Sequence, residues 1–144
     1  MMDLQKMKEY RNNHNPFCQK VGVSVQEVRP NYARAVKIVA PDDANPVGVA
    51  HGGLYFTLCD AVCAYAMGTR GYKAVTINST LNFLKGAKVG TELIAEAFEI
   101  KSGKTICVYE ARITDQKGTL LSNGTFTFFQ LEEKLSFSEE DGSK

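Results

Sequence analysis

The sequence places one carboxylate in a segment that is otherwise apolar. Asp60 is the only charged residue between Gly52 and Gly68, and apolar side chains surround it on every side of a helical wheel. Removing an unpaired carboxylate from water costs on the order of several kcal/mol or raises its pKa. An aspartate in this position is therefore either hydrogen-bonded for structural reasons or retained for chemistry, and the residues alone leave both interpretations open.

The loop that leads into this apolar segment also contains groups that could take part in a reaction. Residues 45–53 are Asn-Pro-Val-Gly-Val-Ala-His-Gly-Gly. Unpaired backbone N–H groups at a helix start, together with the helix dipole, suit the stabilisation of negative charge on a carbonyl oxygen under attack. Gly52 and Gly53 permit a close approach to the backbone, although glycines also serve unusual turns. We expect a functional N–H at Gly52 and a mainly structural role for Gly53.

Composition indicates one ordinary globular domain. The chain has 144 residues, of which 44% are hydrophobic and 23% are charged. Its net charge of +1 comes from scattered Lys and Arg residues, which argues against nucleic acid or an anionic membrane as a partner. Neither a membrane span nor a signal peptide is readable, so we expect a cytoplasmic protein. The four cysteines lack C-x-x-C spacing and a histidine cluster, so we expect no disulfide and no metal.

Hydrophobic periodicity predicts two helices and six strands. The helices are expected over residues 3–12 and 52–68. The strands are expected over residues 21–28, 32–39, 74–84, 91–101, 105–114 and 120–130. Short connectors that contain glycine favour antiparallel neighbours, because parallel crossovers need about a dozen residues or more. We expect the domain to span 1–131 and the polar tail 132–144 to be disordered.

A helix that is apolar on all sides constrains the architecture. One sheet can surround such a helix only if it curls around it, and the open flank of the helix must still be covered. We therefore predict an α+β fold with a strongly curved antiparallel sheet wrapped around one long central helix. Dimerisation would complete the cover.

Several residues together resemble a known family. They are Asn45-x-x-Gly48-x-x-His51-Gly52-Gly53, Asp60 eight residues after Gly52, Asn82-Phe83-Leu84-Lys85 and Val89-Gly90. The combination resembles the hotdog-fold acyl-CoA thioesterases of the phenylacetate-pathway (PaaI-like) type. The resemblance covers about residues 15–130. Gly86 departs from it, since relatives often have proline there.

The resemblance implies a reaction and a set of roles. The reaction is hydrolysis of an aryl- or medium/short-chain acyl-CoA to the free acid and CoA, with coenzyme A as part of the substrate and no separate cofactor. Asp60 would be the catalytic carboxylate, and the Gly52 N–H would bind the thioester oxygen. Asn45 and His51 would orient the substrate, a water or the loop. Further substrate contacts are expected from Gly53, Thr76, Thr80 and Phe83, with Thr76 preferred to Thr80 as the strand hydroxyl that completes the site.

The length of the helix predicts where such a site lies. Gly52 and Asp60 are separated by eight residues, or about 12 Å along a helix axis. Because a carbonyl is attacked from about 3 to 3.5 Å, the two residues can serve one thioester only if they belong to different subunits. Twofold symmetry then creates two equivalent sites per dimer. This agrees with the homodimer or dimer of dimers, with sites between subunits, that the resemblance implies.

Two other functions remain open. An enoyl-CoA hydratase or dehydratase on the same fold would need a histidine and a carboxylate directed at the substrate, whereas His51 is at the mouth of the helix. A non-catalytic acyl-CoA-binding sensor would act through a protein partner. For His51 we favour a structural, orienting role, because a cationic base at a helix N-terminus is electrostatically disfavoured. Whether Asp60 attacks the carbonyl or deprotonates a water is left open.

Substrate specificity is not readable from the chain. Cations available for CoA phosphates are Arg70, Lys85, Lys88, Lys101 and Lys104. Aromatic residues that could line an acyl pocket or simply fill the core are Tyr55, Phe56, Tyr65 and Phe83.

Overall fold

Six antiparallel strands form one sheet in the order β1-β2-β4-β5-β6-β3. The computed structural model describes residues 2–137. The strands are β1 (Val25–Arg29), β2 (Tyr32–Ile38), β3 (Tyr72–Phe83), β4 (Glu92–Ser102), β5 (Ile106–Thr114) and β6 (Leu120–Lys134). The helices are α1 (Leu4–Asn13), α2 (Pro16–Val21) and α3 (Gly52–Gly68), with a short 3-10 turn at Pro41–Asp43.

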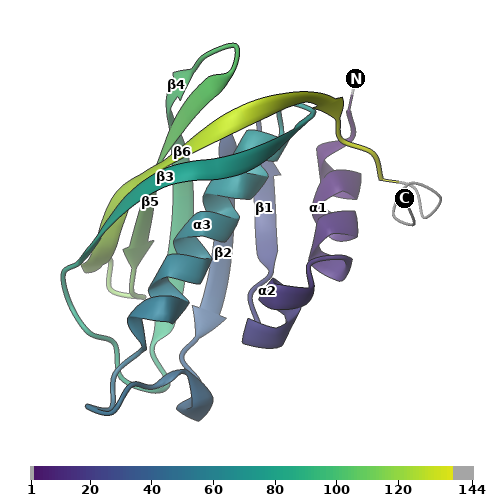
Figure 1. Ribbon diagram of the computed structural model, residues 1–144. Helices are drawn as coiled ribbons and strands as arrows, with labels where there is room; N and C mark the ends of the chain where they lie inside the picture. Colours follow the sequence, from purple (N-terminus) through teal and green to yellow (C-terminus); the bar gives the residue numbers. More distant parts are fainter. Residues whose placement is uncertain (1, 138–144) are drawn as a thin grey trace.

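The sheet curves around α3, which lies in its concave face (Figure 1). Helices α1 and α2 stand beside β1 and α3 at one flank of the sheet (Figure 1). The α+β architecture predicted from the apolar helix is therefore confirmed.

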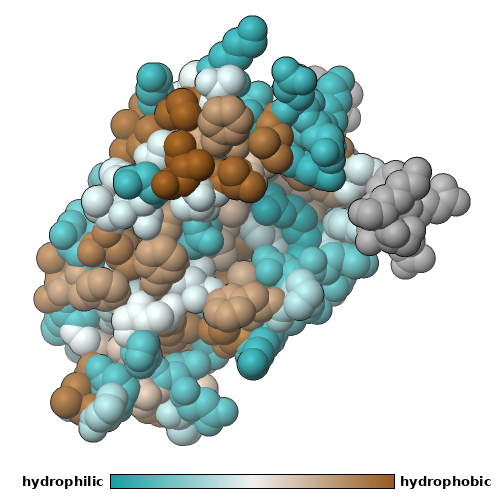
Figure 2. All heavy atoms as spheres, viewed as in Figure 1, coloured by the Kyte–Doolittle hydropathy of each residue, from teal (hydrophilic) through white to brown (hydrophobic). Residues whose placement is uncertain are grey.

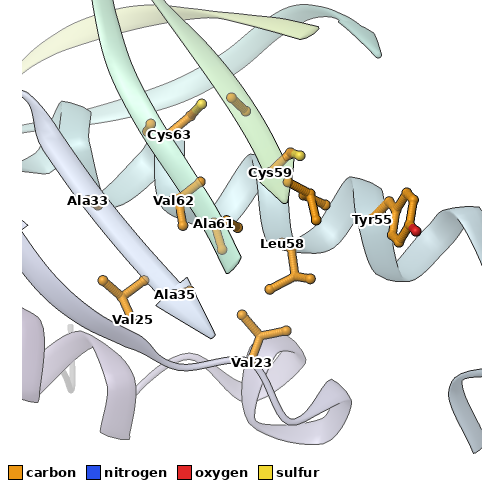
Figure 3. Packing of buried hydrophobic residues seen from close by; sticks show 14 of the residues in the cluster. Val23, Val25, Ala33, Ala35, Tyr55, Leu58, Cys59, Ala61, Val62 and Cys63 are labelled. Atoms are coloured by element: carbon orange, nitrogen blue, oxygen red, sulfur yellow. The ribbon is translucent and has the colours of Figure 1, made fainter. Parts of the chain in front are cut away.

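Small side chains let the sheet approach the helix closely. Ala33 pairs with Ala97, and Ala97 pairs in turn with Ala111, so alanines face α3 from three neighbouring strands. All three are fully buried. On the helix side, Leu58 and neighbouring apolar residues fill the space between α3 and the strands (Figure 3). Helix geometry puts these core contacts on the faces of α3 that meet the sheet.

One side of α3 is left open. The residues on this side recur at helical spacing and are half-buried or exposed. We call them the open stripe: Gly53, Phe56, Thr57, Asp60 and Ala64. The sequence predicted a helix that is apolar and buried on every side. The structure shows that this face of the helix is not fully buried.

The edge strand β3 is exposed as well. One of its edges pairs with β6, and the other has no strand partner among residues 2–137. Val75 and Ile77 are 50% and 53% exposed. Apolar side chains gather along the course of β3 and β6 in Figure 2. Proteins that remain monomeric rarely expose a sheet edge that is long, unpaired and apolar.

The structure corrects the expected elements at both ends of the domain. The strand expected over 21–28 begins only at Val25, and residues 16–21 before it form α2. This short helix forms because Asn15 caps it, Pro16 occupies its first turn and Gly22 ends it in the left-handed conformation (φ 84°). At the other end, β6 continues to Lys134, into the segment expected to be disordered. An ion pair between Lys73 and Glu133 accompanies this extension. Residues 138–144 of the expected tail lie outside the described residues.

Other features of residues 2–137 bear on function. No helix there is long and apolar enough to cross a membrane. The four cysteines are buried free thiols. Within that range, no group of three or more His, Cys, Asp or Glu residues is arranged to hold a metal ion.

Candidate active site

Asp60 lies on the open stripe with one hydrogen-bond partner. The hydroxyl of Thr76, on β3, donates to Asp60 Oδ1 over 2.9 Å. No Lys or Arg within residues 2–137 forms an ion pair with this carboxylate. Burial raises the pKa of Asp60 above its ordinary value, and the hydrogen bond from Thr76 opposes this rise. The carboxylate is therefore more basic than an exposed aspartate, as a general base or nucleophile requires.

A groove of about 740 Å³ runs between α2 and α3, and Asp60 lines it. Phe17 and Cys18 of α2 form part of one wall, and Phe56 and Ala61 of α3 lie with Asp60 on the other. We call this hollow the α2–α3 groove. Asp42 and Asp43 line the groove as well, and Asp60 is the aspartate that α3 contributes. The apolar side chains of the groove beside the carboxylate of Asp60 suit an apolar group attached to a polar reacting centre.

His51 is the N-cap residue of α3. Its Nδ1 accepts a hydrogen bond of 2.8 Å from the N–H of Gly53, so this nitrogen carries no proton. The backbone N–H of His51 donates to Asp43 O over 2.7 Å. These bonds fix the entry of the chain into α3 and occupy the Gly53 N–H within the chain. His51 therefore caps α3 in this structure, and its expected role in orienting substrate or water stays a prediction.

The preceding loop is held by polar side chains. Asn45 Oδ1 accepts hydrogen bonds from the N–H groups of Val47 (3.1 Å) and Val49 (3.2 Å). Lys37 Nζ pairs with Asp43 Oδ2 at 3.0 Å, and both side chains are nearly buried. The backbone carbonyl of Asp43 also accepts the hydrogen bond from the N–H of His51. The ion pair therefore helps to hold the residue that anchors the start of α3. Asn45 thus shapes the loop in this structure.

The N–H of Gly52, the first residue of α3, has no hydrogen-bond partner among the described residues. It lies beside a hollow of about 290 Å³ that Asn45, Tyr55, Phe83 and Gly52 line, here called the Gly52 hollow. A Cβ on Gly52 would lie 3.2 Å from Phe83 Cε1. A side chain at this position would therefore crowd the hollow.

One chain does not bring the expected residues into one site. Asp60, His51 and Gly53 line the α2–α3 groove, whereas Gly52, Asn45 and Phe83 line the Gly52 hollow. Gly52 and Asp60 belong to the same uninterrupted helix, which keeps them about 12 Å apart along its axis.

The two threonines expected near the site differ in their contacts. Thr76 reaches Asp60, whereas Thr80 Oγ1 lies 3.1 Å from Thr125 Oγ1 on the neighbouring strand β6. The preference for Thr76 as the hydroxyl beside the carboxylate therefore agrees with the geometry. The hydroxyl of Thr80 is paired within the sheet, and its expected contact with the substrate stays a prediction.

Sequence reasoning missed Phe17 and Cys18 as groove residues. They lie on α2, whose segment was expected to lead into a strand. The capping signals Asn15-Pro16 and Gly22 would have predicted this short helix. Of the cations considered for CoA, Lys85 lines the Gly52 hollow, whereas Arg70 is engaged by Gln130 and the carbonyl of Gly103.

Known proteins are similar to this chain in sequence and in fold. The thioesterase superfamily matches residues 47–122. The acyl-coenzyme A thioesterase PaaI of Escherichia coli is 30% identical over 115 residues, which cover 76% of this chain and 82% of that protein. The structure of the E. coli PaaI protein from the phenylacetic acid degradation operon covers 91% of this chain and 99% of its own at a TM-score of 0.82; at 24% identity it shows the shared fold.

A hypothetical thioesterase from Streptococcus pneumoniae, solved with coenzyme A, is also similar. It has a TM-score of 0.75 and 30% identity, covering 78% of this chain and 88% of that one. Two further structures of the pneumococcal protein carry single alanine replacements, one of an aspartate and one of a threonine. The replaced positions lie 16 residues apart, which is also the separation of Asp60 and Thr76.

Proposed function

This chain belongs to the thioesterase superfamily, and from that premise we propose that it hydrolyses acyl-CoA thioesters with Asp60 as the reacting carboxylate and Gly52 as the oxyanion donor. The chain is a thioester hydrolase by family. The proposal adds the CoA thioester as substrate and assigns the catalytic residues.

The observation that carries the assignment is the half-buried Asp60, which has a hydroxyl partner and no cationic one. Such a carboxylate is raised in basicity and exposed to a groove that admits an acyl group. The aspartate and threonine replaced in the pneumococcal relative have the same separation, which supports the pairing of Asp60 with Thr76.

Two routes lead from these residues to the products. In one, Asp60 accepts a proton from water, the resulting hydroxide attacks the thioester carbon, and the C–S bond breaks to give the acid and CoA. In the other, Asp60 attacks directly, CoA leaves, and water hydrolyses the acyl anhydride. In both, the Gly52 N–H and the dipole of α3 stabilise the negative oxygen. A single turnover in ¹⁸O-water separates them, because only the anhydride route can deliver an unlabelled oxygen from Asp60 to the product.

We further propose that the enzyme works as a homodimer joined along β3. The unpaired edge and the exposed Val75 and Ile77 would be covered if β3 met its copy from a second subunit. The α2–α3 groove of one subunit would then receive the Gly52 N–H of the other, which resolves the separation of about 12 Å along a single helix. A dimer of such dimers is compatible with this arrangement.

A relative that binds coenzyme A supports a CoA ester as the substrate. The pneumococcal protein was solved with coenzyme A. In this chain Lys85 borders the Gly52 hollow and is available for a CoA phosphate. The hydratase alternative receives less support, because His51 Nδ1 is used to cap α3 and no histidine within residues 2–137 is hydrogen-bonded to Asp60.

Release of free thiol from aryl and straight-chain acyl-CoA esters tests the proposal. We expect release from at least one member of the panel, catalysed by the full chain. Hydration of an enoyl-CoA with no thiol release from any ester would favour the hydratase, and inactivity in both assays would refute the enzymatic assignment.

A further inference from the structure

A cavity of about 300 Å³ adjoins the α2–α3 groove. Ala64 lines both spaces, and it follows Asp60 by one helical turn, about 6 Å along α3. Val75, the neighbour of Thr76 on β3, lines the cavity as well. An acyl group whose carbonyl reacts at Asp60, and which extends one helical turn along the open stripe, would meet this cavity at Ala64.

Arg11, on α1, lines the cavity. Its Nη1 donates to Ala64 O over 3.2 Å, and its guanidinium carbon lies 4.5 Å from the centre of the Tyr65 ring. None of the ion pairs within residues 2–137 includes Arg11. Burial lowers the pKa of this guanidinium, which marks the cost of holding the cation there.

The remaining N–H groups of Arg11 are available to a ligand. No fully buried side-chain nitrogen or oxygen within residues 2–137 lacks a hydrogen-bond partner. One hydrogen bond within residues 2–137 uses one of the five N–H donors of Arg11, so the guanidinium nitrogens without a partner keep some exposed surface. Gly68 contributes to this arrangement, because a Cβ there would overlap Arg11 Nη1.

The cavity lining is positive and apolar. Besides Arg11, its only charged member is Lys73, which is paired with Glu133, and no described carboxylate lines it. Much of the remaining surface comes from apolar and aromatic side chains such as Phe128 and Leu131. A ligand that matches this surface has a hydrocarbon body and an anionic end.

We propose that Arg11 binds a carboxylate at the far end of the acyl group, so that the enzyme prefers ω-carboxyacyl-CoA substrates, the mono-CoA thioesters of dicarboxylic acids. The inference rests on the proposed thioesterase function and adds its substrate class. A guanidinium suits this task because its planar fork binds a carboxylate through two parallel hydrogen bonds. If Arg11 served only to hold α1 against α3, the single N–H that donates to Ala64 O would be enough.

The test compares adipyl-CoA with hexanoyl-CoA, which has the same carbon number and no terminal carboxylate. For the wild-type enzyme, kcat/KM is expected to be higher for adipyl-CoA. In Arg11→Met, the ratio of the two kcat/KM values should fall by about 10- to 100-fold, as expected for the loss of a charge-assisted hydrogen-bonded pair. Arg11→Lys, which keeps the charge without the fork, should give an intermediate ratio.

Arg29→Met is the matched control. Arg29 also lies over a tyrosine ring, 4.0 Å from the centre of Tyr32, but lines none of the cavities described above. Its replacement should leave the substrate ratio unchanged.

Each contrary outcome has its own meaning. Equal wild-type rates on both esters, or a ratio unaffected by Arg11→Met, would overturn the carboxylate proposal while leaving the thioesterase function intact. An equal fall on both esters in Arg11→Met would also overturn it, because Arg11 would then serve a CoA phosphate or the fold. No thiol release from either ester or from the wider panel would refute the proposed function itself. If Arg11→Met does not fold, the wild-type preference and Arg11→Lys still decide the question.

Discussion

The hydroxyl of Thr76, on the unpaired edge strand β3, donates a hydrogen bond of 2.9 Å to Oδ1 of Asp60 in the middle of α3. This bond joins the exposed edge of the sheet to the open stripe of the helix. Both surfaces therefore meet at the one carboxylate to which the reaction is assigned. A change in the packing of β3 would alter the environment of that carboxylate directly.

Replacing Asp60 with asparagine is expected to reduce kcat by at least ~100-fold, comparable to removing one main transition-state contributor. Asparagine keeps the size and the hydrogen-bonding capacity of the side chain but cannot act as base or nucleophile. Steady-state thiol release measures the loss. Retention of the full rate would exclude Asp60 as the reacting group.

The same variant should be more stable than the wild type at neutral pH. Burial raises the pKa of Asp60 in the folded chain, so ionisation there opposes folding. The penalty is absent below the ordinary aspartate pKa of about 3.9, grows as the pH rises through the folded pKa, and is complete above it. The melting temperature of Asp60→Asn should therefore exceed that of the wild type by on the order of a few °C at pH 8, and the difference should vanish near pH 3. A wild type that melts higher at pH 8 would contradict this sign.

Thr76→Val should move the acidic limb of the kcat/KM profile to higher pH. The hydrogen bond from Thr76 lowers the pKa of Asp60 against the effect of burial, and valine removes it while keeping the shape. At pH 7 we expect a loss of about 10-fold, as for one hydrogen bond to a charged group. Thr76→Ser retains the hydroxyl and is the control. An unshifted profile in Thr76→Val would mean that this bond does not set the basicity of Asp60.

His51 offers a way to separate capping from catalysis. His51→Ala removes the acceptor for the Gly53 N–H and should cost about 1 kcal/mol of stability, whereas His51→Asn supplies another good N-cap and should recover most of it. If His51 only orients the loop, thiol release should follow the cap and be largely restored in His51→Asn. Equal losses of roughly 100-fold or more in both variants would instead indicate acid–base catalysis by the imidazole.

The sequence predicted the central helix because the segment from Gly52 to Gly68 is apolar apart from Asp60, and it predicted the strands because their side chains alternate. The curvature of the sheet followed from the need to surround that helix. It missed α2, since Val21, Val23 and Val25 alternate as in a strand while the capping residues on either side of the segment decide the local structure. It also could not identify Arg11. The surroundings of Arg11 form only when α1 packs near α3. Arg11 and Ala64 are 53 positions apart, so their contact cannot be read from the sequence around either residue.

Mixed dimers give the sharpest test of a site shared between subunits. Gly52→Pro removes the proposed oxyanion donor at the first position of α3, where proline is well tolerated, and Gly52→Ala controls for crowding against Phe83. Dimers of one Gly52→Pro subunit and one Asp60→Asn subunit, purified through two different affinity tags, should have roughly half the wild-type activity, because twofold symmetry places both intact residues in one of the two sites. Each homodimer should be nearly inactive. If Gly52 and Asp60 acted within one chain, both sites of the mixed dimer would carry a defect. Confirmed heterodimers without restored activity would therefore contradict the shared site.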